Sequence, residues 1–124
     1  MTATVLIADD EPNILISLEF LLKREGYDVK LARDGQEAID AIVAHRPDLV
    51  LLDVMMPRKT GFDVCQEVRA LESVKDTRIL MLTAKGRDTD VAKGLALGAN
   101  AYMTKPFSTR ELVDQVAQML GGGA

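Results

Sequence analysis

Short runs of β-branched and aliphatic residues alternate along the chain with longer segments in which apolar residues recur every three or four positions. The runs predict strands at residues 4–8, 28–32, 48–52, 78–82 and 100–103. Five helices are expected between and after them; the fourth spans about 88–97, and a capping-box pattern from Ser108 to Glu111 begins the fifth. Strands joined through helices run parallel with right-handed crossovers. The sequence therefore predicts an α/β fold, a single doubly wound five-stranded parallel sheet covered by helices on both faces.

Strand composition separates the centre of this sheet from its edge. Residues 5–8 and 49–52 are continuously apolar, as buried central strands are, whereas residues 28–31 alternate like an exposed edge strand. Helix ends are indicated by Pro12 as a first residue, Gly26 as a stop and Asp34 as a cap. The helix positions expected to pack on the sheet are Ile14, Leu15, Leu18, Leu21, Leu22, Ala38, Ile39, Ile42, Val43, Val64, Cys65, Val68 and Leu71.

Length and charge narrow the functional classes. A chain of 124 residues fits one domain, expected at 1–120, with residues 121–124 as a flexible glycine-rich tail. The net charge of −4 disfavours direct binding to nucleic acid or to an anionic membrane surface. We find no apolar targeting segment and no run of membrane-spanning length, so a cytoplasmic location is expected. The single cysteine, Cys65, cannot form an internal disulfide and is interpreted as a packed, inert thiol.

Polar residues follow the predicted strands at positions that the topology brings together. In open parallel sheets the carboxyl ends of the strands meet at one edge, and here that edge receives Asp9, Asp10, Asp53, Thr83 and Lys105. Three crowded carboxylates repel one another, and the repulsion is relieved either by protonation of one of them or by a hard divalent cation, for which Mg²⁺ is the natural candidate. Asp53 is then an oxygen nucleophile for a phosphoryl group. Lys105 would neutralise charge on that group, and Thr83 would donate a hydrogen bond to it.

Each of these residues also has an ordinary structural interpretation. Asp9 and Asp10 alone could be a helix N-terminal cap, Thr83 a common strand-end residue, and Lys105 a solvated surface lysine. Asp53 differs, because the residues that follow it offer no helix to cap. The convergence of all five, rather than any one of them, carries the prediction of a phosphoryl-acceptor site.

The whole pattern resembles the receiver domain of two-component response regulators, of the chemotaxis-regulator type. The resemblance covers nearly the whole chain through the motifs VLIADD at 5–10, DVMMP at 53–57 followed by Gly61, TA at 83–84 and KPF at 105–107. It implies a flavodoxin-like sheet of order 2-1-3-4-5 and a cis peptide between Lys105 and Pro106. It also implies that Asp10 binds Mg²⁺ directly, that Asp9 acts mainly through water, and that Met55 supplies a backbone carbonyl ligand.

The resemblance implies a function as well. Receivers accept a phosphoryl group from a sensor histidine kinase or a histidine phosphotransfer protein, and catalyse only their own phosphorylation and dephosphorylation, so we do not class the chain as an enzyme. The only histidine, His45, is expected to face solvent, which requires the donor to be another molecule. In the family mechanism Thr83 moves toward the phosphoryl group and Tyr102 turns inward, although Tyr102 could instead be an ordinary amphipathic residue of an edge strand. The face of the fourth helix, fifth strand and fifth helix then changes and binds a downstream protein.

Two departures from the family pattern are informative. Asn100 and Ala101 replace the adjacent acidic residues that form intersubunit salt bridges in many DNA-binding regulators, so a phosphorylation-dependent dimer remains possible but that particular one is doubtful. Met55 and Lys85 lie where side chains overhang the phosphoryl group. Because Met55 cannot orient water by strong hydrogen bonding, slow self-dephosphorylation is predicted. Met55 and Met56 are otherwise interpreted as loop packing.

Three functional interpretations remain open at this point: a stand-alone receiver, a receiver cut from a longer transcriptional or enzymatic regulator, and a phosphohydrolase of the haloacid dehalogenase type. Such hydrolases place nucleophile and acid two positions apart after the first strand, whereas Asp9 and Asp10 are adjacent. A flavodoxin-like FMN carrier is disfavoured, because the acidic loop after the first strand lacks a phosphate cradle.

Overall fold

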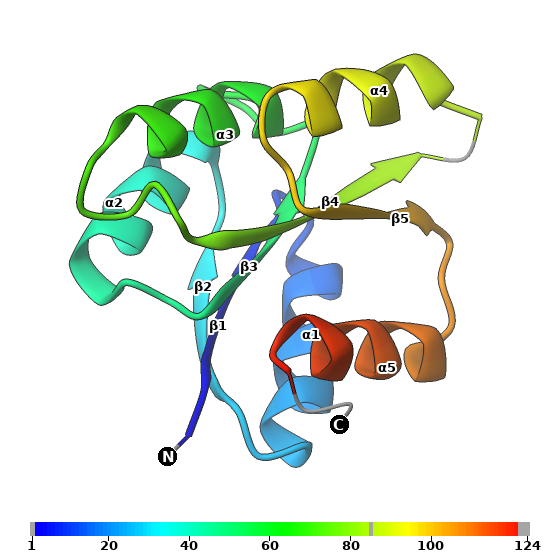
Figure 1. The fold of residues 1–124 in the computed structure, drawn as a ribbon. Coiled ribbons are helices and arrows are strands. Elements are labelled where there is room, and N and C mark those ends of the chain that lie inside the picture. Colours follow the sequence, from blue (N-terminus) through cyan, green and yellow to red (C-terminus); the bar gives the residue numbers. More distant parts are fainter. Residues whose placement is uncertain (1, 85, 122–124) are drawn as a thin grey trace.

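The computed structural model describes residues 2–84 and 86–121, in which five strands and five helices alternate (Figure 1). The strands are β1 (Thr4–Ala8), β2 (Asp28–Ala32), β3 (Leu49–Asp53), β4 (Arg78–Ala84) and β5 (Ala101–Lys105). The helices are α1 (Pro12–Arg24), α2 (Gly35–His45), α3 (Gly61–Ala70), α4 (Asp88–Ala96) and α5 (Thr109–Met119). The predicted role of Lys85 and residues 122–124 of the predicted tail at 121–124 lie outside the described residues.

The five strands form one parallel sheet in the order β2-β1-β3-β4-β5, which confirms the expected topology. β2 lies at an edge, as its alternating composition indicated. The last three strands extend further at their carboxyl ends than the sequence predicted, because parallel pairing continues through Asp53, Thr83 and Lys105. These three side chains therefore project from paired strand ends rather than from the loops that follow, which fixes their backbones.

Two apolar layers enclose the sheet, with α1 and α5 on one face and α2, α3 and α4 on the other (Figure 1). Along β3, Leu49 and Leu51 join the core under α1 and α5, while Val50 and Leu52 join the opposite core. All four are fully buried, because a central strand between two helical layers has no solvent face. The central part of the sheet is thus a rigid base for whatever its carboxyl edge carries.

Two predicted core positions are wrong. Val43 is 45% exposed, because it lies one position beyond the buried Ile42 and is rotated away from the sheet. Leu71 is 38% exposed, because it is the C-cap residue of α3 and its extended backbone leaves the helical stripe. The other predicted helix positions are buried or half-buried.

Local hydrogen bonds explain where several helices begin and end. Asp34 caps α2 by accepting from the backbone N–H of Glu37, as predicted. Ser108 caps α5 in the same way through the N–H of Glu111, which is one half of the predicted capping box. Gly26 follows the end of α1 with a φ of +96°, a conformation that glycine adopts without strain.

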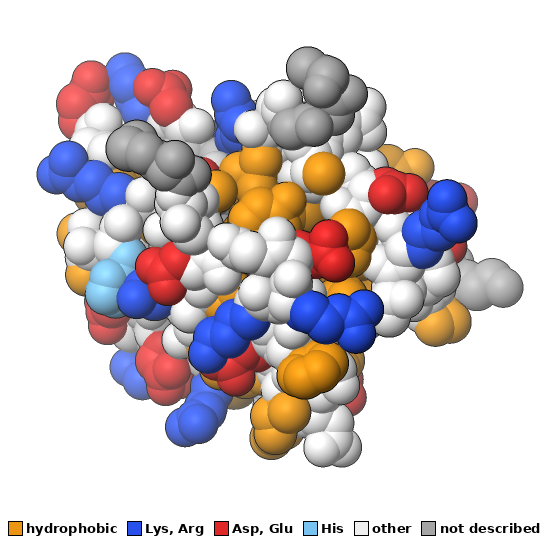
Figure 2. Space-filling view, turned by 90° about the horizontal axis from the view of Figure 1, so that it is seen from below, with side chains coloured by type: hydrophobic (Ala, Val, Ile, Leu, Met, Phe, Trp, Pro, Cys, Tyr) orange, Lys and Arg blue, Asp and Glu red, His pale blue; other side chains and the backbone are white. Residues whose placement is uncertain are grey.

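The surface seen in Figure 2, from the side of α1 and α5, intersperses acidic and basic side chains with hydrophobic ones. On α1, Ile16 and Phe20 are 64% and 67% exposed, and the guanidinium of Arg24 lies 6.0 Å from the centroid of the Phe20 ring. Among the helices described, we find none with both the length and the apolar character needed to span a bilayer.

Candidate functional site

Three carboxylates gather at the carboxyl edge of the sheet. Asp9 and Asp10 follow β1 and Asp53 ends β3, and one oxygen of each lies within 4.8 Å of the others. Asp9 is fully buried and Asp53 is 7% exposed, whereas Asp10 is exposed to solvent. The structure therefore brings together the three acidic residues that the sequence placed at this edge, with two of them largely withdrawn from water.

Lys105 supplies the positive charge of the cluster. Its Nζ donates to Asp9 Oδ2 at 2.9 Å and to Asp53 Oδ1 at 3.3 Å. With its side chain only 21% exposed, Lys105 is not a solvated surface lysine. The peptide between Lys105 and Pro106 is cis, which confirms that expectation.

The alternative role of Asp9 and Asp10 as a helix cap is not supported. Glu11 is the N-cap residue of α1, and no side chain caps that end. Asp9 Oδ1 does accept from the Glu11 N–H at 2.9 Å, which orients its carboxylate, while Oδ2 faces Lys105. Both oxygens of Asp9 are thus held in place beside Asp53.

Burial and charge shift the proton affinities of the site. Desolvation, reinforced by the negative charge of Asp9 and opposed by Lys105, raises the pKa of Asp53 to about 6. Burial alone would lower the pKa of Lys105, but its hydrogen bond to Asp9 and the charges of Asp53 and Asp9 raise it overall. The ammonium therefore stays charged at neutral pH, but it does not offset the combined effect of burial and neighbouring negative charge on Asp53.

Thr83 carries a buried hydroxyl with no hydrogen-bond partner among the residues that the structure describes. An unpaired buried hydroxyl is costly, typically about 1–3 kcal/mol, so its persistence needs an explanation. Thr83 and Tyr102 both line an open cavity of about 340 Å³ between α4 and β5. Tyr102 itself is 49% exposed. Thr83 and Tyr102 thus border the same space, into which a side chain has room to move.

The acidic cluster opens into a pocket of about 330 Å³ whose wall includes residues that the sequence analysis missed. Glu11 lies on one side, and Arg87 and Asp90 at the start of α4 lie on the other. Arg87 Nε lies 3.0 Å from Asp90 Oδ2. The rule that ligands bind beyond strand ends would have found Arg87 and Asp90 had it been extended to the segment after β4.

The two methionines after Asp53 differ from each other. Met56 is 7% exposed and packs in the core, as expected for loop packing, but Met55 is 64% exposed and lines the pocket. The packing interpretation is therefore wrong for Met55, because the chain bends at residues 54 and 55 after the end of β3 and leaves this side chain in solvent. Its exposure places an apolar side chain at the mouth of the site.

Two further expectations concern residues away from the pocket. His45 ends α2 and is exposed, as predicted. Cys65 is fully buried, its thiol lies 3.4 Å from the carbonyl oxygen of Leu97, and burial raises its pKa. A buried thiol with a raised pKa is unreactive, which agrees with the inert role predicted for it.

The cluster has the donor set that a hard divalent cation prefers. Mg²⁺ takes oxygen ligands at about 2.0–2.1 Å, retains several waters and uses only one or two carboxylates. One carboxylate oxygen of each aspartate lies within 4.8 Å of the others, and the carboxylate of Asp10 is open to solvent. Small side-chain movements would bring this arrangement to the coordination that Mg²⁺ prefers. The residues present therefore fit Mg²⁺.

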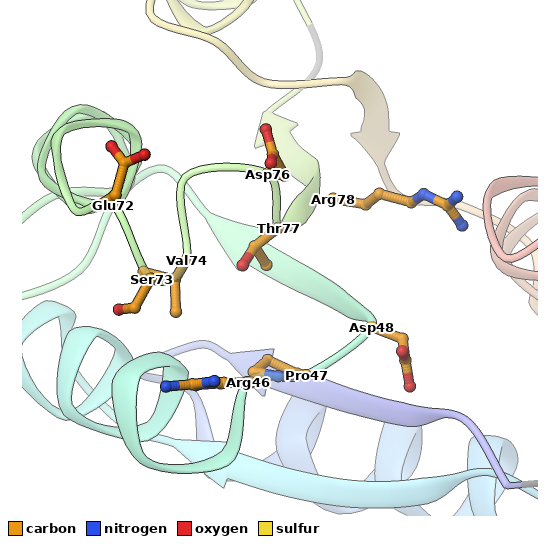
Figure 3. A pocket seen from close by; sticks show the side chains of 9 residues that line it. All are labelled: Arg46, Pro47, Asp48, Glu72, Ser73, Val74, Asp76, Thr77 and Arg78. Atoms are coloured by element: carbon orange, nitrogen blue, oxygen red, sulfur yellow. The ribbon is translucent and has the colours of Figure 1, made fainter.

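A second hollow lies at the amino ends of β3 and β4, opposite the acidic cluster (Figure 3). Its side chains include Arg46, Asp48, Asp76 and Arg78, which carry charges of both signs. Asp48 accepts from the backbone N–H of Thr4, and Arg78 donates to the carbonyl of residue 119. Two of its charged side chains are thus already engaged in holding the fold, and among residues 2–84 and 86–121 the one acidic cluster that could hold a metal ion is the one at Asp9, Asp10 and Asp53.

Four features define the class of phosphorylation-controlled signalling domains called receivers, and the structure has all of them. They are a parallel sheet of order 2-1-3-4-5, paired acidic residues after β1, an aspartate that ends β3 and a lysine that ends β5. Residues 5–117 match the model of the response regulator receiver domain. The chain belongs to this family. Members of this family are signalling domains of two-component systems. Because the chain belongs to it, the haloacid dehalogenase and flavodoxin alternatives are removed.

Solved structures agree with this assignment. A Chloroflexus aurantiacus protein assigned as a response regulator is 38% identical, with a TM-score of 0.92 over 98% of this chain and 99% of that one. The Vibrio cholerae chemotaxis protein CheY4 is 34% identical, with a TM-score of 0.90 over 96% and 99%. The receiver domain of the Pseudomonas aeruginosa sensor histidine kinase PA1611 is 30% identical, with a TM-score of 0.89 over 98% and 99%, and its structure holds a magnesium ion in the active site cleft.

Proposed function

We propose that Asp53 accepts a phosphoryl group from the phosphohistidine of a sensor histidine kinase or a histidine phosphotransfer protein, in a reaction that requires Mg²⁺. The observation that carries the proposal is the position of the Asp53 carboxylate, held by Lys105 at 3.3 Å beside two further acidic residues. The phosphoryl group is transferred once per molecule, so the chain acts as a switch and not as an enzyme with turnover.

The chemistry assigns a task to each residue. An Asp53 oxygen attacks phosphorus, the P–N bond to the donor imidazole breaks, and the electron pair leaves on that nitrogen. Asp10, the carbonyl of Met55 and, through water, Asp9 would hold Mg²⁺, which neutralises charge on the phosphoryl oxygens when bound. Lys105, already aimed at Asp53, stabilises the same charge from the other side.

The unpaired hydroxyl of Thr83 suggests how phosphorylation is read out. A phosphoryl oxygen on Asp53 would give this buried donor the partner that it lacks within the described chain. Movement of Thr83 toward Asp53 would leave room for Tyr102 in the cavity that both residues line. The face of α4, β5 and α5 would then change shape and bind a downstream protein.

The side chain of Asn100 bears on dimerisation. Asn100 Oδ1 accepts from the N–H of Ile79 at 2.8 Å and from Arg69 at 2.9 Å, so it is occupied within the chain. We therefore propose that any phosphorylation-dependent dimer uses contacts other than salt bridges at this position. The receiver unit of this proposal spans 1–120 and works in the cytoplasm, where histidine kinases use ATP.

Stand-alone and longer forms remain distinct versions of the same proposal. This chain covers 99% of CheY4 but only 27% of NtrX from Brucella abortus, to which it is 26% identical. Receivers thus occur both as nearly whole proteins and as parts of larger ones, and the output differs accordingly.

The test is a phosphorylation assay with a small donor. Incubation with Mg²⁺ and acetyl phosphate should increase the mass of the parent chain by one phosphoryl group, whereas Asp53→Asn should stay unmodified. Chelation of Mg²⁺ should prevent the modification of the parent. Equal labelling of parent and variant would refute the assignment of Asp53, and sustained release of phosphate at many turnovers per molecule would restore the hydrolase alternative.

A further inference from the structure

We propose that Gly35, at the start of α2, is a positioning residue for the metal site: it sets the path of the loop between β3 and α3 and thereby the Met55 carbonyl. This inference deepens the proposed function and rests on it. The loop, residues 54–60, connects the phosphoryl acceptor to α3. Gly35 comes from a different strand–helix connection, the one that follows β2. It lies outside the acidic pocket, so it would act through the loop and not by contact with the metal.

The backbones of α2 and the loop meet at Gly35 with no space between them. A β-carbon added there would overlap the carbonyl oxygen of Lys59 and lie 2.5 Å from Lys59 Cβ. Contacts under 3.0 Å do not occur for real β-carbons, so the loop would have to retreat by roughly half an ångström or more. The Gly35 N–H also faces the Pro57 carbonyl at 3.4 Å, and that carbonyl accepts from the Lys59 N–H at 2.8 Å. Displacement at Lys59 therefore carries over to Pro57, two residues after Met55.

The two ends of the loop are fixed, so a displacement is concentrated in its middle. Val54 donates to the Leu82 carbonyl and accepts from the Gly61 N–H at 2.9 Å, which ties the start of the loop to β4 and α3. At its end, Thr60 and Asp63 form a reciprocal capping box on α3. Met55 lies between these anchors. A push from α2 cannot move the anchored ends, so it alters the direction of the backbone around Met55.

Magnesium is the ion that is sensitive to such a change. It requires nearly ideal octahedral geometry at about 2.0–2.1 Å, whereas Ca²⁺ accepts flexible geometry at about 2.3–2.6 Å. A displaced carbonyl ligand should therefore weaken Mg²⁺ binding more than Ca²⁺ binding. Losses caused by supporting residues behind a metal site are about 10–100-fold, and we expect about tenfold here.

The experiment measures Mg²⁺ and Ca²⁺ dissociation constants by NMR titration of folded protein, with urea unfolding in parallel. Gly35→Ala should weaken Mg²⁺ binding about tenfold and Ca²⁺ binding clearly less. Ile42→Val is the matched control, because it removes a methyl group from the buried face of the same helix, about two turns from the contact between Gly35 and Lys59. It should lower stability and leave both dissociation constants unchanged.

A second pair of variants covers the case in which Gly35→Ala does not fold. Lys59→Val adds a branch at the β-carbon that faces Gly35, and Lys59→Met removes only the ion pair between Lys59 and Glu67. Mg²⁺ binding should weaken in the valine variant relative to the methionine variant. Any of three results would overturn the inference. Folded Gly35→Ala could keep the Mg²⁺ affinity of the parent, Ile42→Val could lose as much Mg²⁺ affinity as Gly35→Ala, or the two Lys59 variants could bind Mg²⁺ equally well. A parent chain that binds no Mg²⁺ would instead refute the proposed function.

Discussion

Replacement of Asp53 by asparagine should make the metal-free protein more stable at neutral pH. The pKa of Asp53 is about 6 in the folded chain against an ordinary value of 3.8, because burial and the charge of Asp9 oppose its ionisation. A carboxyl with a raised pKa binds its proton more tightly in the folded state than in the unfolded state. Stability therefore falls as pH rises between about 4 and 6, and the loss is complete above that window.

The shift of about two pKa units corresponds to about 3 kcal/mol at 1.36 kcal/mol per unit. Asparagine has nearly the same shape and no charge, so Asp53→Asn should gain up to this amount over the parent near pH 7.5 and almost nothing near pH 4. Lys105 keeps its bond to Asp9 at 2.9 Å in the variant, which leaves its ammonium paired. For a chain of this length, a gain of this size would raise the melting temperature by about 10 °C.

Urea unfolding followed by far-ultraviolet circular dichroism, with a chelator present, measures the difference at both pH values. Asp114→Asn is the control, because it removes an equal charge from an exposed position on α5. Addition of Mg²⁺ should stabilise the parent more than Asp53→Asn, since the variant has lost one carboxylate of the cluster. A difference between parent and Asp53→Asn that does not grow with pH, or that Asp114→Asn reproduces, would refute the electrostatic reasoning.

Three further outcomes are expected. Met55→Asn should lose its phosphoryl group faster than the parent, because an amide at the exposed position 55 can orient water; an unchanged or slower decay would contradict this. Arg69→Met should lower the free energy of unfolding by about 2–4 kcal/mol, because Arg69 donates to the carbonyl of Gly98 and to Asn100, and a loss below about 1 kcal/mol in urea titration would contradict it. Cys65 should resist a thiol reagent in the native protein and react on unfolding, and rapid native labelling would show that the burial is incomplete.

The acidic cluster was predictable because the strands are parallel and its residues follow or end them. Parallel strands deliver their carboxyl ends to one edge whatever their separation in sequence, so Asp9, Asp53 and Lys105 meet although 96 positions separate the first from the last. The recurrence of apolar residues every three or four positions in the helical segments predicted the two buried layers that enclose the sheet. The cis peptide and the sheet order came from the family resemblance, and the structure confirms both.

The features that were missed depend on how loops and helices approach one another. The contact of Gly35 with Lys59 joins residues from separate connections, and nothing in the local pattern of either segment indicates that they meet. Arg87 enters the pocket from the loop after β4, a placement that depends on the path of that loop. Met55 and Met56 look alike in sequence, and only the direction of each side chain separates the exposed residue from the packed one.

The charge balance of the acidic cluster explains why Lys105 alone does not neutralise the three carboxylates. Three ionised carboxylates and one ammonium leave an excess of two negative charges in a largely buried space. Burial, reinforced by the negative charges of Asp9 and Asp10, raises the pKa of Asp53 despite the opposing effect of Lys105. A divalent cation would cancel the excess charge, which frees Asp53 to react as a carboxylate at neutral pH. Phosphorylation of Asp53 would add about one further negative charge there. That renewed imbalance would favour any arrangement that brings another donor to the group, and Thr83, on the neighbouring strand, has a hydroxyl without a partner among the described residues.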